Sequence, residues 1–123
     1  MDAAYDLHAE VLKALADPRR LEIVHMLGTG PRGLSTLASG VSDSETSVSQ
    51  HLAVLLGAGL VEARPIRGSM RYALCDPDVL AACDLMHRVL RRRLERLSHT
   101  DGPDSPTGRP SELSRRPAGE VRA

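Results

Sequence analysis

The chain contains no phenylalanine and no tryptophan, and only 2% of its residues are aromatic. A hydrophobic core must therefore be built from Leu, Val, Ala, Ile and Met, which suits helices packed on helices better than a sandwich or a barrel. With 123 residues there is room for one domain and a tail. Because a small aliphatic core is only marginally stable, a partner subunit often supplies additional buried area.

Apolar residues recur at helical spacing through the first half of the chain and predict four helices. Asp17 and Pro18 are typical of an N-cap and a first helical residue, and the Gly57-Ala58-Gly59 stretch is typical of a helix end. In the fourth helix we expect Val48, Leu52 and Leu55 to face inward. The predicted helices cover residues 3–17, residues 18–27, residues 34–41 and a segment that ends at about Leu56.

Two short β-type segments follow, residues 60–66 and residues 70–74, and the Arg67-Gly68-Ser69 stretch between them indicates a hairpin. Pro65 cannot donate a backbone hydrogen bond, so it fits the edge position that a two-stranded wing provides. The residues after the hairpin predict one more helix, with Asp76 as its cap and Pro77 at its first position. Its apolar stripe would consist of Val79, Cys83, Met86, Leu90, Leu94 and Leu97.

From Ser98 onward the composition changes to Pro, Ser, Gly and mixed charge, with few apolar residues. Such a segment cannot bury enough surface to offset its ordering entropy, so we expect residues 98–123 to be a disordered tail and residues 1–97 to form the domain. The tail is balanced in charge, as is the whole chain with a formal net charge of +0. A globally basic field is therefore absent, and DNA binding would depend on where the arginines lie.

Polar side chains gather on the outer side of the fourth predicted helix, which follows the third after a short turn, as in a helix-turn-helix. A helix fits the major groove of DNA, and its exposed first turns reach the base edges. Ser47, Gln50 and His51 have the spacing of one helix face, and arginines lie in and around the hairpin. These side chains could instead merely cap and solvate an amphipathic helix. The predicted DNA contacts are Thr46, Ser47, Ser49, Gln50, His51, Arg64, Arg67 and Arg71.

The segments LKALADPRRLEIVHMLGTGPRGLSTLASGV and TSVSQHLAVLLGAGLVEARPIRGSMRYAL together resemble the ArsR/SmtB family of bacterial winged-helix repressors. They match its A-L-A-D-P-x-R opening, its S-x-V-S-x-H-L recognition helix and its R-x-G-x-x-x-Y-x-L wing, and the likeness covers roughly residues 7–97. The resemblance implies a mainly α fold with a small β-hairpin wing, a winged helix-turn-helix. It also implies a homodimer that pairs through the first and last helices and represses a double-stranded DNA operator.

Metal-sensing members of the family carry ligand motifs that can be compared with this chain. The third-helix motif would need thiols where Gly33 and Ser35 stand, and the last-helix motif has the wrong offset at Asp84 to His87. The remaining effector candidates are Cys75, Cys83 and His87. Thiolate and imidazole suit a soft or borderline ion such as Zn(II) or Cu(I), and the two thiols could instead form a redox pair. A third interpretation makes Cys83 an inert apolar residue within its stripe.

Other classes of function have less support in the sequence. The wing and fourth helix could bind a partner protein without binding an operator. No Gly-rich phosphate loop and no arrangement of catalytic Ser, His and Asp stands out, so we do not expect an enzyme. No apolar run is long enough to span a bilayer and no leader begins the chain, so we expect a cytoplasmic protein with no membrane partner.

Overall fold

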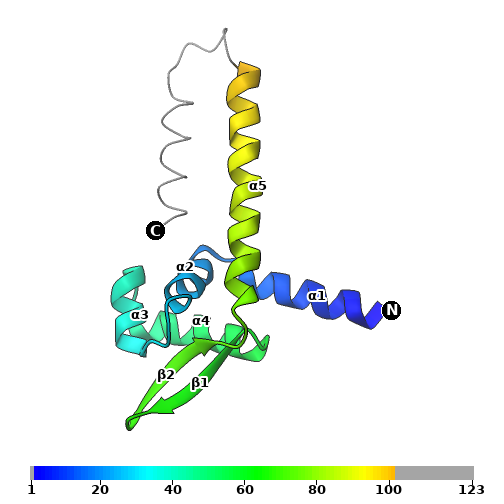
Figure 1. Cartoon of the computed structure of the whole chain (residues 1–123). Helices are drawn as coiled ribbons and strands as arrows, with labels where there is room; N and C mark the ends of the chain where they lie inside the picture. Colours follow the sequence, from blue (N-terminus) through cyan, green and yellow to red (C-terminus); the bar gives the residue numbers. More distant parts are fainter. Residues whose placement is uncertain (1, 102–123) are drawn as a thin grey trace. The chain divides into compact units, whose positions relative to one another are not determined.

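The computed structural model describes residues 2–101. Its elements follow the predicted order of four helices, a hairpin and a last helix, and the predicted fold class is confirmed (Figure 1). They are α1 (Asp2–Leu15), α2 (Pro18–Leu27), α3 (Leu34–Val41), α4 (Glu45–Gly57), β1 (Val61–Ile66), β2 (Ser69–Leu74) and α5 (Asp78–Asp101). The chain divides into two units, the first formed by residues 1–80 and the second beginning at Ala81.

Local capping interactions explain why the helix ends could be predicted. The carboxylate of Asp17 accepts hydrogen bonds from the backbone N–H groups of Arg19 and Arg20, at 2.9 and 3.3 Å, and so begins α2. Gly59 follows α4 with a φ of +75°, a conformation that glycine adopts without strain. The next N–H, that of Leu60, donates to the carbonyl of Leu55 at 3.0 Å, which completes a Schellman motif.

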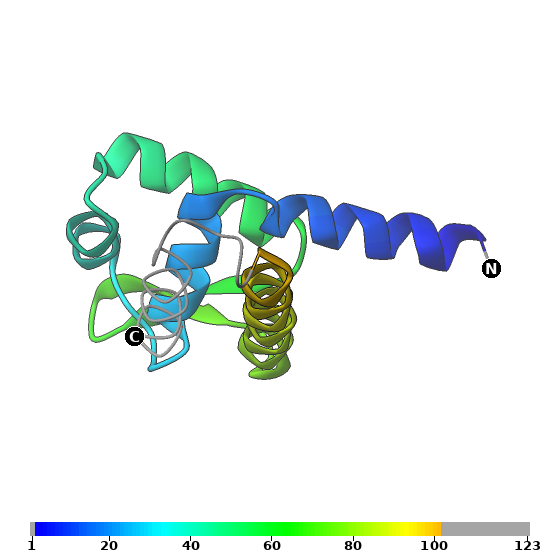
Figure 2. The ribbon, with the colours of Figure 1, turned by 90° about the horizontal axis from the view of Figure 1, so that it is seen from above.

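The core of the first unit is aliphatic, as expected from the composition. Figure 2 shows α2, α3 and α4 from above, and each contributes one apolar face to this core. Val48, Leu52 and Leu55 of α4 are at most 1% exposed, which confirms their predicted inward orientation. The other buried apolar residues of this unit are Ala14, Ile23, Val24, Leu27, Leu37, Ala38, Val41, Leu60, Val61 and Ala73.

Helix α1 contributes little to this core. Residues 3–10 are all exposed, and Figures 1 and 2 both show the amino-terminal half of α1 extending away from α2 and α4. Its apolar side chains Tyr5, Leu7 and Leu12 are 69%, 67% and 53% exposed. An isolated helix of this length is marginal in water, so an exposed apolar face of this kind is expected to meet another surface.

The hairpin has a shorter turn than the sequence suggested. Ile66 pairs with Ser69, so only Arg67 and Gly68 form the turn, and the predicted three-residue join that included Ser69 was wrong. Both turn residues have positive φ, 53° and 81°, which is the pattern of a type I′ turn and matches the twist of the two strands. β2 has a further neighbour that was not predicted, because Arg32 exchanges two backbone hydrogen bonds with Tyr72, at 2.8 and 3.0 Å.

Helix α5 is longer than predicted. The carboxylate of Asp76 accepts a hydrogen bond from the N–H of Asp78 at 2.8 Å, as expected for its cap. The helix continues through Asp101, so residues 98–101, which were assigned to the tail, are helical. Residues 102–123 of the predicted disordered tail lie outside the described residues. Exposed apolar side chains on α5 are Leu85, Met86, Val89, Leu90 and Leu97.

None of the helices within residues 2–101 has the length and apolar character needed to cross a membrane.

Candidate nucleic-acid interface

A three-residue turn, residues 42–44, joins α3 to α4 and forms a helix-turn-helix. Ser42 ends α3 with a φ of 57°, in the left-handed region that non-glycine residues rarely adopt. Ser44 then begins α4, and its side-chain oxygen accepts a hydrogen bond from the N–H of Ser47 at 3.0 Å. The direction of α4 is thus defined at its first turn by a cap that satisfies a free N–H group.

Asp43 connects the first turn of α4 to α2. Its carboxylate accepts a hydrogen bond from the Ser47 hydroxyl at 2.8 Å, and Arg19 of α2 lies 3.7 Å from the same oxygen. The hydrogen bond from Ser47, followed by that from the backbone N–H of Ser44, lowers the pKa of Asp43 below its ordinary value. Ser47 is therefore half-buried and engaged within the protein rather than directed to solvent.

His51 lies one turn further along the same flank. It is half-buried, and its Nδ1 lies 3.3 Å from a guanidinium nitrogen of Arg20 on α2. The sequence interpretation grouped Ser47, Gln50 and His51 on one outward face, and the structure corrects it, because only Gln50 of the three is exposed. The physical reason is that α2 and the turn before α4 supply polar partners that the local sequence could not reveal.

The outward side of α4 is a narrow polar stripe. Val48, Leu52 and Leu55 point into the core, and at 100° per residue the opposite side carries Thr46 and Gln50, with Ser49 beside them. All three polar residues are exposed. They are short or amide side chains with donors and acceptors, which is the chemistry that reads base edges and phosphate oxygens.

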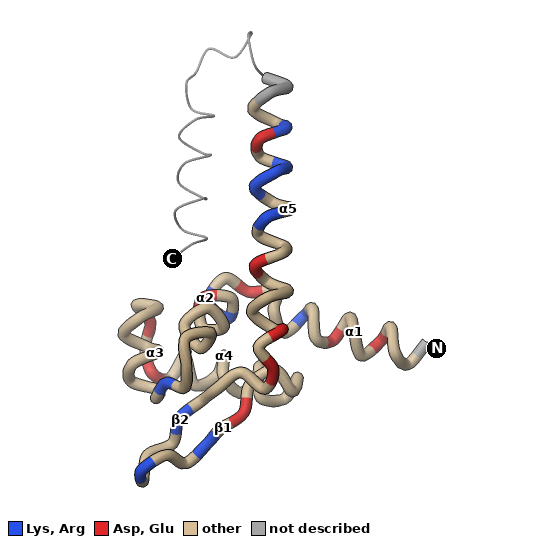
Figure 3. The backbone as a smooth tube through the Cα atoms, viewed as in Figure 1, with Lys and Arg blue, Asp and Glu red and all other residues tan. Residues whose placement is uncertain are grey.

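The hairpin carries three exposed arginines, seen as blue segments along both strands and at the turn in Figure 3. Arg64 and Arg71 stand directly opposite each other in the strand register, and Arg67 occupies the turn. Like charges directly opposite on two strands are destabilising, so this arrangement favours a polyanionic partner. Glu62 partly compensates, because its carboxylate accepts a hydrogen bond from Arg64 Nε at 2.6 Å.

The effector candidates are distributed over both units, with Cys75 in the first and Cys83 and His87 in the second. Desolvation, followed by the charge of Glu62, raises the pKa of the exposed Cys75 thiol. Burial, followed by the charge of Asp84, raises the pKa of Cys83. Raised values leave less thiolate, which is the form that binds metal and reacts. Among the described residues, no group of three or more His, Cys, Asp or Glu side chains gathers to hold a metal ion.

Asp43, Arg19 and Arg20 are the residues that sequence reasoning missed as parts of the site. From the sequence, Asp43 was assigned no role in the site, and the two arginines were placed only within the second helix. Their partners lie far away along the chain: Arg20 and His51 are separated by 31 positions. The sole local signal was the Asp-Pro-Arg-Arg stretch itself, which predicts a helix start and says nothing about the far partner.

Comparison with known proteins agrees with this geometry. A family model described as a helix-turn-helix domain matches residues 15–64. The transcriptional activator HlyU of Vibrio cholerae is 38% identical over 79 residues, which cover 64% of this chain and 73% of HlyU. The regulator Rv0081 of Mycobacterium tuberculosis is 36% identical over 91 residues, which cover 73% of this chain and 80% of Rv0081.

The fold has a solved counterpart in Mb0332 from Mycobacterium bovis, a homodimeric winged helix-turn-helix DNA-binding domain described as a possible ArsR-family regulator. Its structure is similar to this one with a TM-score of 0.69 and 35% identity, and the match covers 80% of this chain and 88% of that chain. The helix-turn-helix, the arginine-bearing wing and these likenesses lead to one assignment. The chain belongs to the ArsR/SmtB family of winged helix-turn-helix transcriptional regulators.

Proposed function

We propose that the chain acts as a homodimeric repressor that binds a double-stranded DNA operator, with α4 in the major groove and the hairpin on the flanking backbone or minor groove. The observation that carries the proposal is the exposed stripe of Thr46, Ser49 and Gln50 on a helix whose opposite face is fully buried. A helix anchored in this way presents its outward side chains with little freedom, as direct readout of bases requires.

The side chains divide by the part of DNA that each can contact. Gln50 can bond bidentately to adenine, and a good pair of this kind contributes about 1–3 kcal/mol of discrimination against the wrong base. Thr46 and Ser49 can donate to bases or phosphates. Arg64, Arg67 and Arg71 supply charge to the phosphate backbone, which gives affinity without sequence preference.

The dimer follows from the exposed apolar surface. Leu7 and Leu12 of α1, and Met86 and Leu90 of α5, are each at least 43% exposed. Burying such side chains against a second copy is favourable by about 25 cal/mol per Å² of apolar surface. Two copies related by a twofold axis would read two half-sites about one helical turn of DNA apart.

Repression requires nothing beyond operator binding, because a dimer bound across a promoter blocks transcription. The names of the relatives include both activation and repression of transcription: HlyU is named an activator, and a protein of Synechocystis is named a repressor SmtB homolog. The proposal involves no catalysis, and it puts the protein in the cytoplasm, where the DNA of a bacterial cell lies. Cys75, Cys83 and His87 stay predictions as the effector site, by metal or by redox chemistry.

Binding to the DNA upstream of the protein's own gene, measured by fluorescence anisotropy across salt concentrations, tests the proposal. We expect a steep salt dependence and a footprint with twofold symmetry. Gln50→Ala should lose about 1–3 kcal/mol of operator affinity while retaining binding to unrelated DNA. Ser39→Ala, an exposed change on α3, is the matched control. A protein that binds no DNA but captures a partner protein through α4 would contradict the proposal.

A further inference from the structure

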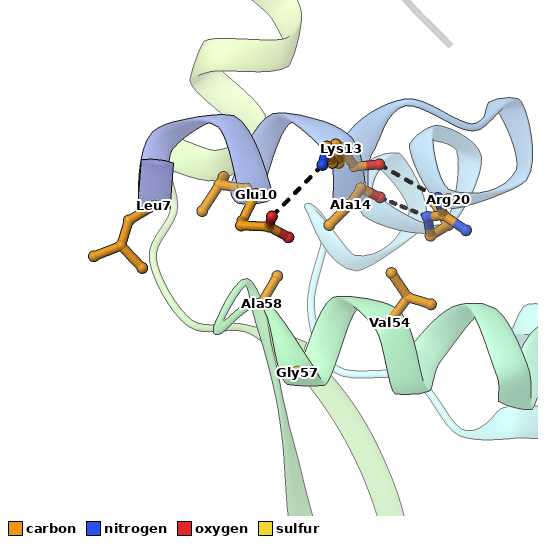
Figure 4. Close-up of a pocket in the computed structure, with 9 residues that line it drawn as sticks. Leu7, Glu10, Lys13, Ala14, Arg20, Val54, Gly57 and Ala58 are labelled. Carbon is orange, nitrogen blue, oxygen red and sulfur yellow. Dashed lines mark hydrogen bonds and ion pairs between the residues drawn. The ribbon is translucent and has the colours of Figure 1, made fainter. Parts of the chain in front are cut away.

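One side chain, Arg20, contacts two helices besides its own. Its Nε donates to the carbonyl of Ala14 at 2.5 Å, and its Nη2 lies 3.4 Å from the carbonyl of Lys13, both at the carboxyl end of α1 (Figure 4). Its Nη1 lies 3.3 Å from Nδ1 of His51, on α4. The last carbonyl groups of a helix lack hydrogen-bond donors within the helix and attract a cation. The carboxyl end of α1 therefore binds the guanidinium of Arg20 favourably.

The contact with His51 requires a particular state of the imidazole. A guanidinium is always charged and can only donate, so the Nδ1 of His51 must accept, and the ring proton must sit on Nε2. The link therefore exists when His51 is neutral. Protonation would place a second donor and a second positive charge against Arg20.

Helices α1 and α4 also approach each other directly, and a groove lies along part of their boundary. This groove has a volume of about 730 Å³, and its apolar walls include Leu7 and Val11 on α1, Val54 on α4 and Ala58 directly after α4. Arg20 lines the same groove, as the close-up in Figure 4 shows. The guanidinium therefore adds a polar connection between the two helices beside this groove.

We propose that Arg20 is a positioning residue for DNA binding, which fastens the recognition helix α4, through His51, to the carboxyl end of α1. The inference rests on the proposed function and deepens it. Since α1 exposes the apolar face assigned to the dimer, the link transmits the position of the dimer helix to the helix that reads DNA. Lysine could not replace arginine, because a single ammonium cannot form this fork toward two helices.

The test compares Arg20→Lys, His51→Leu and the double variant, all as full-length chains, for operator affinity at pH 7.5 and dimerisation by sedimentation. Each single change should weaken operator binding about tenfold, as expected for a lost charge-assisted hydrogen bond, and leave dimerisation unchanged. The double variant should be no worse than either single one, since both remove the same link. Fully additive losses would overturn the proposal.

A conservative variant distinguishes the link from a merely structural role. His51→Asn retains an acceptor near the position of Nδ1, so its operator affinity should stay close to that of the wild type, whereas His51→Leu loses the acceptor and should bind about tenfold more weakly. His8→Asn, an exposed change on α1, should bind like the wild type. Equal losses in His51→Asn and His51→Leu would contradict the inference.

Two measurements on the DNA-free protein separate this inference from the proposed function. Nitrogen NMR of the His51 ring should show the proton on Nε2, and hydrogen exchange of residues 45–57 should accelerate in Arg20→Lys. If the wild type binds no DNA, the proposed function fails, but these two measurements still test the link between Arg20 and His51. A proton on Nδ1, or unchanged exchange in α4, would refute it.

Discussion

Replacing Arg67 with glycine isolates the contribution of the wing to DNA binding. Arg67 has a φ of 53°, where an L-residue costs about 1–2 kcal/mol, and glycine would relieve this strain. The greater freedom of glycine in the unfolded chain costs about 0.5–1 kcal/mol, so the free energy of unfolding should stay the same or rise slightly. Alanine would keep the strain, which makes glycine the better choice for removing the charge alone.

The effect on DNA binding can be estimated from counterion release. Each phosphate contact contributes about 0.9 to the slope of log K against log salt, and a dimer presents two wings, so the slope should fall by about 1.8. That slope corresponds to a loss of about 60-fold in affinity at 0.1 M salt and about 18-fold at 0.2 M. Because the contact is with the backbone, operator and unrelated DNA should lose affinity alike.

Fluorescence anisotropy over a salt series measures both quantities. Arg92→Gln removes the same charge from an exposed position on α5 and should leave the slope unchanged. If Arg67→Gly has the wild-type slope, the wing does not contact phosphates, and the assignment of its arginines is refuted.

The remaining predictions concern the dimer, the turn and the response to acid. Leu90→Glu should put an unpaired charge into the dimer interface, cost about 3–5 kcal/mol and give a monomer at micromolar concentration in sedimentation; a stable dimer would exclude α5 from the interface. Ser42→Gly should raise the free energy of unfolding by about 0.5–1 kcal/mol in urea, because glycine relieves the left-handed φ of 57°, and a decrease would show that the strain is absent. Hydrogen bonds from Ser47 and Ser44 hold the pKa of Asp43 below its unfolded value, so its stabilisation is present above about pH 4 and lost as the pH falls through the folded pKa. Asp43→Asn should therefore unfold more easily at pH 7 but approach the wild type below pH 4, and parallel pH curves would contradict this linkage.

The features of the fold that could be predicted from the sequence are those that depend on residues close together in the chain. The bounds of α2 and α3 followed from Asp17, Pro18 and the spacing of apolar residues, because caps and periodicity act within a few positions. The inward face of α4 followed from the same periodicity. The aliphatic core followed from composition, since no large aromatic residue was available to fill it.

The errors arose where the residue types alone do not determine the structure. The turn at Arg67 was expected to be longer, because arginine rarely adopts a positive φ and its presence does not predict one. The pairing of Ile66 with Ser69 leaves a two-residue turn, in which Arg67 has a positive φ. Ser47 and His51 were assigned to the outer face because polar residues at helical spacing look alike in sequence whether they meet solvent or protein. Their actual partners come from α2 and the turn before α4.

The correction on α4 also changes how the site can achieve specificity. In the proposed complex, the exposed polar side chains that α4 of one copy offers to the bases are Thr46, Ser49 and Gln50, since Ser47 and His51 are half-buried. A mismatched base pair typically costs about 1–3 kcal/mol. So few contacts from a single copy cannot single out one operator among the many sites of a genome. Specificity must then come from two copies held at a fixed separation, and so from the rigidity of the path between the dimer helices and α4. In this proposal, the contacts of Arg20 with α1 and with His51 serve DNA recognition by fixing that geometry.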